Sequence, residues 1–245
     1  MLYNKKLIVE YVGTDFAGWQ VQPNGRTVQE ELHKALSKMY KTKVTVIGSG
    51  RTDSGVHALG QVANFRTERY IPPENVHMGL NSMLPEDISI SSVEDVPEDF
   101  HAQLNAVSKT YLYRIFPSRV RSAMLAGRTW WVKDELNYKR MCELLKYFEG
   151  EHDFTSFCVQ TSLRENNVRR INNIRCYRED KVICIEINGN GFLHNMVRII
   201  AGTVVEALRK GYGDEYIKEA IEGRDRSKAG PTAHAAGLYL KKVYY

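Results

Sequence analysis

The sequence predicts an α+β protein whose sheets are mainly antiparallel. Strand-like runs and amphipathic helices alternate along the 245 residues, so both element types are expected to share a core. Several strands follow one another too closely for a helical crossover, as at 171–177 and 182–187, and this spacing favours hairpins. Because the same order of elements recurs, we expect two similar α/β halves, 1–104 and 105–245.

The first half contains the clearest single element, a helix over 28–40. Thr27 and Glu30 form a capping box at its start, and Val28, Leu32 and Leu36 recur on one face. A second helix is expected after Pro73, over 74–83. The expected strands of this half are 7–12, 44–47, 61–65 and 88–93.

The second half repeats this pattern. Its expected strands are 109–116, 171–177, 182–187 and 238–244, and its expected helices are 138–148, 192–208 and 215–221. A chain of this length can bury a substantial core as one large domain or two small ones.

Composition sets weak limits on function. A net charge of +5 and a pI near 8.9 are compatible with a polyanionic partner without requiring one. The four cysteines form no Cys-x-x-Cys pair, which argues against a zinc site and fits reduced thiols in the cytosol. Neither a signal peptide nor a membrane-spanning run is expected, so we predict a cytoplasmic protein.

The loop over 48–61 is the most informative stretch. Its four glycines stand between two strand-like runs and enclose Arg51, Asp53 and His57. Glycines of this kind allow positive φ or close backbone approach, and rigid strands on either side would hold a reactive side chain in place. The alternative is an ordinary turn, for which Thr-Asp-Ser-Gly is a good sequence.

A second signal is the strand segment Lys-Thr-Tyr-Leu-Tyr at 109–113. Alternation along a strand places Lys109, Tyr111 and Tyr113 on one face, which would offer a cation for phosphate and rings for stacking a base. An ordinary strand explains the same residues, since tyrosine favours strands.

A third signal lies in the expected helix at 192–208. His194, Arg198, Ala201 and Gly202 share one face at helical spacing. Small residues beside an arginine would let that face approach another element and bring the guanidinium to a carboxylate. A solvated polar face is the alternative.

Two other kinds of chemistry find little support. Asp53 and His57 are four residues apart, but glycine disfavours a helix there and no set of three or four metal ligands is complete. A serine nucleophile would need Gly-x-Ser-x-Gly between a strand and a helix, which the sequence lacks.

Together these motifs resemble those of the tRNA pseudouridine synthase A (TruA) family. The segments are Gly-Arg-Thr-Asp-Ser-Gly-Val-His-Ala-Leu-Gly-Gln-Val at 50–62, Lys-Thr-Tyr-x-Tyr at 109–113, and Phe-Leu-His-Asn-Met-Val-Arg-x-Ile-x-Gly at 192–202. Shorter similarities at 16–20, 27–29, 100–102, 153–157 and 237–240 occur in the family's order, so the resemblance covers nearly the whole chain.

The resemblance implies a fold and an activity. The fold is that of two α/β halves related by a pseudo-twofold axis, with their sheets flanking a central RNA-binding cleft. The activity is isomerisation of uridine to pseudouridine at positions 38 to 40 in the anticodon stem-loop of tRNA, by a homodimer without cofactor or metal.

The resemblance also implies roles for individual residues. Asp53 falls on the catalytic aspartate, whose target (C1′ of the ribose, the uracil ring or a sugar proton) the sequence leaves open. Tyr111 falls on the tyrosine that stacks on the target base, and Arg198 on the arginine that pairs with the aspartate. Arg51 would replace the extruded nucleotide or hold phosphate. Further RNA contacts are expected from Lys109, Tyr113, His57 and His194.

Three departures from the family pattern bear on specificity. Gln103 stands where the family usually has arginine, Ser54 where alanine is usual, and the segment 234–236 lacks the usual proline. Loss of one cation weakens the expected RNA-backbone contact there. The alternatives to the enzyme are a non-catalytic tRNA-binding or tRNA-folding protein on the same scaffold and a metal-dependent nuclease. Asp53 favours the enzyme, because a pure binder of an anionic ligand has no need of a carboxylate.

Overall fold

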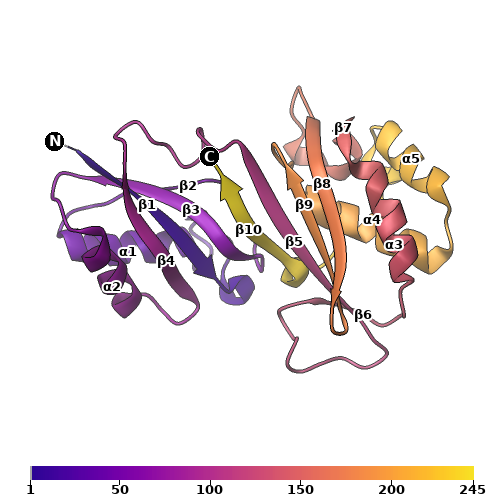
Figure 1. Cartoon of the computed structure of the whole chain (residues 1–245), viewed down its shortest axis with the longest axis horizontal. Helices are drawn as coiled ribbons and strands as arrows, with labels where there is room; N and C mark the ends of the chain where they lie inside the picture. Colours follow the sequence, from indigo (N-terminus) through magenta and orange to yellow (C-terminus); the bar gives the residue numbers. More distant parts are fainter. Residues whose placement is uncertain (1) are drawn as a thin grey trace. The chain divides into compact units, whose positions relative to one another are not determined.

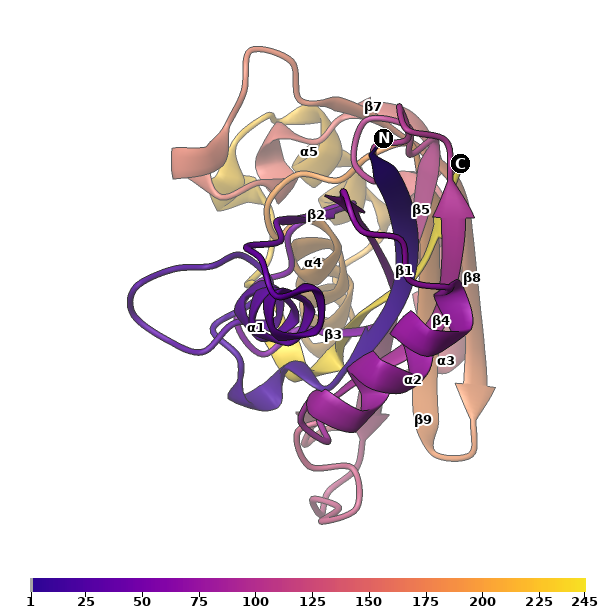
Figure 2. The same cartoon turned by 90° about the vertical axis from the view of Figure 1, so that its left-hand side faces the viewer.

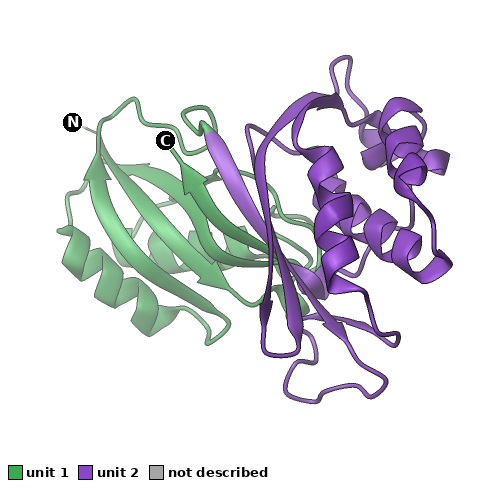
Figure 3. Ribbon diagram, turned by 45° about the vertical axis from the view of Figure 1, so that its right-hand side comes forward, with its two compact units in different colours: residues 1–107, 239–245 green, residues 108–238 purple. Residues whose placement is uncertain are grey.

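The computed structural model describes residues 2–245 and divides them into two compact units (Figures 1 and 3). Of the described residues, the first unit contains 2–107 and 239–245, and the second contains 108–238. The expected division between residues 104 and 105 did not include the return of the C-terminal strand to the first unit. The last seven residues return to the first unit, because their strand pairs with a strand of that unit.

The first unit is built on the strand order β4-β1-β3-β10, with β2 also pairing with β3. The bounds are β1 Tyr3–Tyr11, β2 Val46–Gly48, β3 His57–Thr67, β4 Ile88–Val96 and β10 Leu238–Tyr244. All pairs in this unit are antiparallel except β3 with β10, where Tyr239 lies opposite His57. The predicted antiparallel character is confirmed here.

Two helices, α1 (Val28–Tyr40) and α2 (Pro73–Met83), pack against each other beside these strands (Figure 2). Thr27 caps α1 by accepting a hydrogen bond from the Glu30 amide at 3.3 Å, as the sequence predicted. Val28, Leu32 and Leu36 are fully buried, so the apolar face of α1 contributes to the core of this unit.

The second unit has the strand order β6-β5-β9-β8-β7. The bounds are β5 Ser108–Pro117, β6 Trp130–Val132, β7 Gly150–Asp153, β8 Val168–Glu179 and β9 Val182–Gly189. The central pairs are antiparallel, including the predicted hairpin of β8 and β9. Strands β6 and β7 are short and were not predicted.

Three helices complete the second unit: α3 (Tyr138–Leu145), α4 (Met196–Lys210) and α5 (Asp214–Glu222). Helix α4 contacts both α3 and α5, and a cluster of buried aromatic rings lies nearby, in which Phe148 and Phe157 meet edge-on at 5.2 Å. Among residues 2–245, no helix is both long and apolar enough to cross a membrane.

Helix α4 begins four residues later than predicted. Asn195 adopts the left-handed conformation with φ 64° and is the residue before the first helical turn. The prediction that Phe192 and His194 lie on the same helix as Arg198 is therefore wrong. These two residues belong to the non-helical segment between β9 and α4.

Candidate functional site

Strand β3 holds the start of the loop that carries Asp53. The Ser49 amide donates to the Val62 carbonyl at 2.7 Å, and the Ser49 hydroxyl donates to Oε1 of Gln61 at 2.7 Å. The Gln61 side-chain amide in turn donates to the Gly50 carbonyl at 2.8 Å. Both Ser49 and Gln61 are fully buried, so the start of the loop is fixed by polar contacts within the core.

The middle of the loop is held by the residues around Thr52. The Thr52 hydroxyl is hydrogen-bonded to the phenol of buried Tyr11 at 2.7 Å, and the Thr52 carbonyl accepts from the Trp19 amide at 3.1 Å. The turn closes through the Val56 amide, which donates to the Asp53 carbonyl at 3.1 Å. Asp53 itself is half-buried, one residue beyond this anchored threonine.

A second segment, 13–19, packs against the same loop. Gly18 has φ +101°, and a Cβ there would lie 2.6 Å from the Thr52 carbonyl oxygen. The Phe16 carbonyl accepts from the Ser54 hydroxyl at 3.2 Å and from the Gly55 amide at 3.3 Å. The backbone therefore approaches the Asp53 loop more closely than any side chain at Gly18 would permit.

Ion pairing holds this second segment in place. The Arg26 guanidinium lies 4.3 Å from the centroid of the Phe16 ring and makes two hydrogen bonds to the Asp87 carboxylate, at 2.7 and 3.0 Å. The hydrogen bond to Asp87 raises the pKa of Arg26. Neither Arg26 nor Asp87 was singled out by sequence reasoning, since their partnership spans 61 residues.

Arg51 is the most accessible of the candidate residues in the loop. Its side chain is exposed, and its Nε donates to Oε1 of Gln20 at 3.2 Å. An exposed guanidinium two residues from a half-buried carboxylate fits the expected contact with RNA.

His57 does not lie where the prediction required. Only 1% of its surface is exposed, its Nδ1 accepts from the Gly13 amide at 3.0 Å, and its ring stacks on Tyr239 at 4.5 Å. This burial favours a packing role for His57 over the predicted contact with RNA. The ring instead braces the end of the loop against β10.

In the second unit, Lys109 and Tyr111 lie half-buried on β5. The ring of Tyr111 meets Phe192 edge-on, with centroids 4.9 Å apart. Burial lowers the pKa of Lys109. Sequence reasoning assigned no contact to Phe192, although it lies within the third motif.

Tyr113, two residues further along, is a core residue. It is fully buried, and its phenol donates to the His234 carbonyl at 2.7 Å. A Cβ on Gly237 would lie 2.7 Å from the Tyr113 ring, and burial raises the pKa of the phenol well above its ordinary value. The segment 234–237 covers that part of the strand, which favours a core role for Tyr113 over the predicted contact with RNA.

Arg198 lies in the first turn of α4, half-buried. Its Nε donates to the Ala233 carbonyl at 2.8 Å and its Nη1 to Oδ1 of Asn195 at 2.8 Å, while the Ala233 amide donates back to the Arg198 carbonyl at 3.1 Å. The guanidinium is thus oriented by the backbone of the segment after α5. A Cβ on Gly202 would lie 1.8 Å from the Pro231 carbonyl oxygen, so the small-residue face of α4 accommodates this same segment.

The remaining candidates lie at the surface. His194 is exposed, and its Nδ1 is hydrogen-bonded to the Ser162 hydroxyl at 2.8 Å. Gln103 is also exposed, and its amide donates to Nδ1 of His101 at 3.2 Å.

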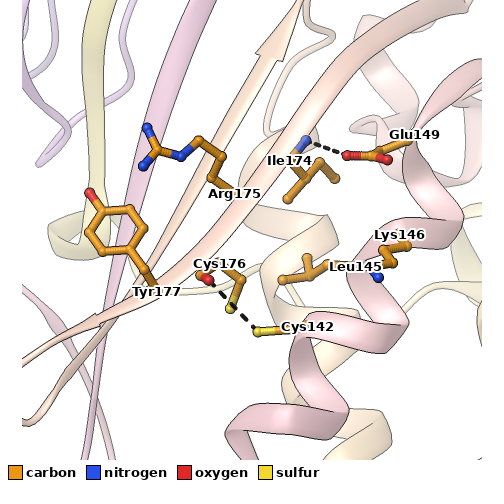
Figure 4. Close-up of a pocket in the computed structure, with 8 residues that line it drawn as sticks. All are labelled: Cys142, Leu145, Lys146, Glu149, Ile174, Arg175, Cys176 and Tyr177. Carbon is orange, nitrogen blue, oxygen red and sulfur yellow. Dashed lines mark hydrogen bonds between the residues drawn. The ribbon is translucent and has the colours of Figure 1, made fainter.

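Other features of the described residues lie apart from these motifs. Within residues 2–245 no three His, Cys, Asp or Glu side chains are grouped so as to hold a metal ion. A cavity of about 360 Å³ lies between α3 and β8, beside Cys142 and Cys176 (Figure 4). The Cys142 thiol donates to the Cys176 carbonyl at 3.9 Å, and burial raises the pKa of Cys176. None of the predicted site residues lines this cavity.

Comparison with known proteins identifies the class to which this scaffold and its motifs belong. A sequence model of the family described as tRNA pseudouridine synthase matches residues 7–105 and 144–245. The chain is 46% identical to a tRNA pseudouridine synthase A from Ruminiclostridium cellulolyticum over 98% of both chains. It is 47% identical to one from Acetivibrio thermocellus over 99% of both chains.

These similarities show that the chain is a pseudouridine synthase. It belongs to the family of tRNA pseudouridine synthases, as the three sequence motifs predicted. Among solved structures, a Cbf5-Nop10-Gar1 complex is 12% identical with a TM-score of 0.38, covering 92% of this chain and 60% of that one.

Proposed function

We propose that this enzyme converts uridine to pseudouridine at positions 38 to 40 in the anticodon stem-loop of tRNA, with Asp53 as the catalytic carboxylate. The observation that carries the proposal is the anchoring of the Asp53 loop. Its backbone is tied to β3 through Ser49 and to the segment 13–19 through Thr52, and Asp53 follows half-buried. Such support places a reactive group in a defined position before substrate binds.

The reaction breaks the bond between N1 of uracil and C1′ of ribose and joins C5 to C1′. The hydrogen on C5 is lost to water and N1 gains a proton, so product and substrate are isomers and no oxidant or reductant is consumed. One ionised carboxylate beside the sugar and the base is sufficient to begin the reaction, through C1′, the uracil ring or a sugar proton. We assign that function to Asp53.

Tyr111 is assigned to stacking on the extruded uracil. Phe192 supports the assignment, because its edge-on contact at 4.9 Å fixes the plane of the tyrosine ring. Extrusion of the base from the helical stack costs a few kcal/mol. Arg51, exposed in the same loop as Asp53, is assigned to filling the place of the extruded nucleotide or to holding a backbone phosphate.

Arg198 is assigned to pairing with Asp53, which orients the carboxylate. Its own hydrogen bonds to Ala233 and Asn195 support this assignment, since they fix the guanidinium before the partner arrives. We expect Arg198→Met to abolish turnover and Arg198→Lys to restore part of it, measured as single-turnover rates with saturating enzyme. Equal rates for wild type and Arg198→Met would refute the assignment.

Cellular location, oligomeric state and tRNA binding are proposed from the resemblance of the motifs to the family. We infer a cytoplasmic homodimer that binds tRNA, in keeping with the family resemblance of the motifs. Light scattering of the purified protein should give twice the mass of the 28.1 kDa chain. None of the comparisons favours the non-catalytic tRNA-binding alternative.

Target positions are tested with tRNA transcripts that keep a single uridine among positions 38, 39 and 40. After incubation with the enzyme, pseudouridine is located by mass spectrometry of nuclease fragments. We expect conversion at each of the three positions and none in a transcript whose uridines all lie outside the anticodon stem-loop. Conversion only outside that region would overturn the proposed specificity while leaving the chain a synthase.

A further inference from the structure

Gln29 is a buried polar residue in the first turn of α1, outside the loop that carries Asp53. Its Oε1 accepts a hydrogen bond from the Val21 amide at 3.0 Å, and its Nε2 donates to the Val46 carbonyl at 2.9 Å. Both ends of the side-chain amide therefore have backbone partners, and these partners are 25 residues apart in the chain. One side chain joins α1 to two separate segments of the first unit.

The first of these segments, 13–21, is tied to the Asp53 loop through Trp19. The Trp19 carbonyl accepts from the Gln29 amide at 3.0 Å, one of the helix-start amides that have no partner within the helix. The Trp19 amide donates to the Thr52 carbonyl at 3.1 Å. Because Thr52 directly precedes Asp53, this path leads from Gln29 to the catalytic loop in two backbone hydrogen bonds.

The second segment, β2, continues directly into the same loop. One edge of β2 pairs with β3, and at Val46 the backbone is also held by side chains of α1. Gln29 donates to the Val46 carbonyl, and His33, one helical turn later, accepts from the Val46 amide at 3.0 Å through Nε2. Two side chains of α1 thus fix the residue at which β2 begins.

The two segments also pack against each other. A Cβ on Gly48, the last residue of β2, would lie 2.5 Å from Cε2 of the buried Trp19 ring. The indole therefore rests directly on the β2 backbone. Because a protein interior is closely packed, a shift of Val46 relative to Val21 would displace the indole or the backbone beneath it.

We infer that Gln29 is a positioning residue for Asp53. It sets the position of the segment 13–21 relative to β2, and these two segments determine where the carboxylate lies. This inference rests on the proposed function, since it takes Asp53 as the catalytic carboxylate. Gln29 is buried beneath the loop's supports and acts through them, so its loss lowers the rate of the bound complex and leaves binding of tRNA intact.

Two substitutions of Gln29 separate its two contacts. Gln29→Met keeps the length of the side chain and removes both hydrogen bonds. Gln29→Glu keeps the size and the oxygen that accepts from the Val21 amide, but a carboxylate has no hydrogen to donate to the Val46 carbonyl. The second variant therefore removes only the contact with β2.

Asn81 supplies matched controls, because its side chain ties α2 to β4 in the same way. Its Oδ1 accepts from the Ile90 amide at 2.8 Å, and its Nδ2 donates to the Ile90 carbonyl at 2.9 Å. Neither α2 nor β4 continues into the Asp53 loop. Asn81→Leu matches Gln29→Met, and Asn81→Asp matches Gln29→Glu in the charge that it introduces.

The rate is measured as single-turnover tritium release from C5-labelled tRNA with the enzyme in saturating excess. An unfolded fraction then lowers the concentration of active enzyme but leaves the rate constant unchanged, so a purely structural defect does not alter it. Filter retention gives the Kd for tRNA, and urea unfolding gives the stability of each variant.

We expect Gln29→Met to lower the rate constant by about 100-fold, the effect of displacing a catalytic group by about 1 Å. Gln29→Glu should lower it by about tenfold, since one of the two hydrogen bonds remains. The Kd should stay within about twofold of wild type in both, because no contact with the substrate is removed. Both Asn81 variants should match wild type in rate constant and Kd.

Wild-type rate constants in both Gln29 variants would overturn the inference, and so would an equal loss in the Asn81 variants. A raised Kd at an unchanged rate constant would also overturn it. If Gln29→Met fails to fold, Gln29→Glu carries the test, and failure of both to fold would show a role in stability alone. Failure of the proposed function gives a different pattern, because Asp53→Asn would then release tritium at the wild-type rate.

Discussion

Substitution of Gly18 by alanine should reduce the activity of the enzyme indirectly, by displacing the loop that carries Asp53. At φ +101° an alanine is strained by about 1–3 kcal/mol. Its Cβ would lie 2.6 Å from the Thr52 carbonyl oxygen, where ordinary contact begins at 3.4 Å, so one backbone must move by about 0.8 Å. Asp53 follows Thr52 directly, and a displacement of that size at a catalytic group reduces kcat by about 100-fold.

Gly211→Ala is the matched control for this prediction. Gly211 also has positive φ, +69°, but a Cβ there meets nothing within 4 Å. It should cost about 1–2 kcal/mol of stability and leave kcat unchanged. Urea unfolding gives the stability of each variant, and single-turnover tritium release gives kcat.

The reasoning would be refuted if Gly18→Ala kept a kcat within twofold of wild type. It would also fail if Gly211→Ala lost as much activity as Gly18→Ala. The first result would mean that the close approach at Thr52 does not position Asp53. The second would mean that general destabilisation explains the loss.

Two further predictions concern residues away from the reacting groups. Tyr113→Phe should destabilise the protein by about 0.5–1.5 kcal/mol, because the part-buried His234 carbonyl loses its donor. KM for tRNA should stay unchanged, and a raised KM at unchanged stability would support Tyr113 as an RNA contact. Hydrogen bonds from Lys210 and, to a smaller extent, Tyr216 lower the pKa of Glu206 below its ordinary value of 4.5. The ionised carboxylate therefore contributes its full stabilisation above pH 4.5, and this contribution is lost as the pH falls through the lowered pKa. Glu206→Gln should therefore reduce the loss of melting temperature between about pH 5 and pH 3, and an acid profile identical to that of wild type would contradict it.

The elements that sequence predicted well are those whose signals are local. Helix α1 begins at Val28 as expected, because the capping box at Thr27 and the apolar spacing of Leu32 and Leu36 need no distant partner. The start of α4 was predicted too early, since its limit depends on the left-handed backbone at Asn195. Short strands such as β6 and β7 carry too few residues to show alternation.

The candidate site likewise divides into residues with local sequence signals and residues whose surroundings depend on distant parts of the chain. The motifs selected Asp53, Tyr111 and Arg198, which lie half-buried in the loop before β3, on β5 and on α4 respectively, and their roles stay predictions. Alternation along β5 also selected Tyr113, whose burial depends on a segment more than 120 residues away. The burial of His57 could not be predicted for a similar reason, because the strand β10 that covers its ring comes from the end of the chain.

The central claim is that Asp53 performs the isomerisation of uridine. The most direct measurement is release of tritium from tRNA transcripts labelled at C5 of uridine, with wild type compared to Asp53→Asn, which keeps the size of the side chain and removes its charge. We predict release by wild type and none by Asp53→Asn at equal tRNA binding. Release by Asp53→Asn at a rate close to that of wild type would contradict the claim.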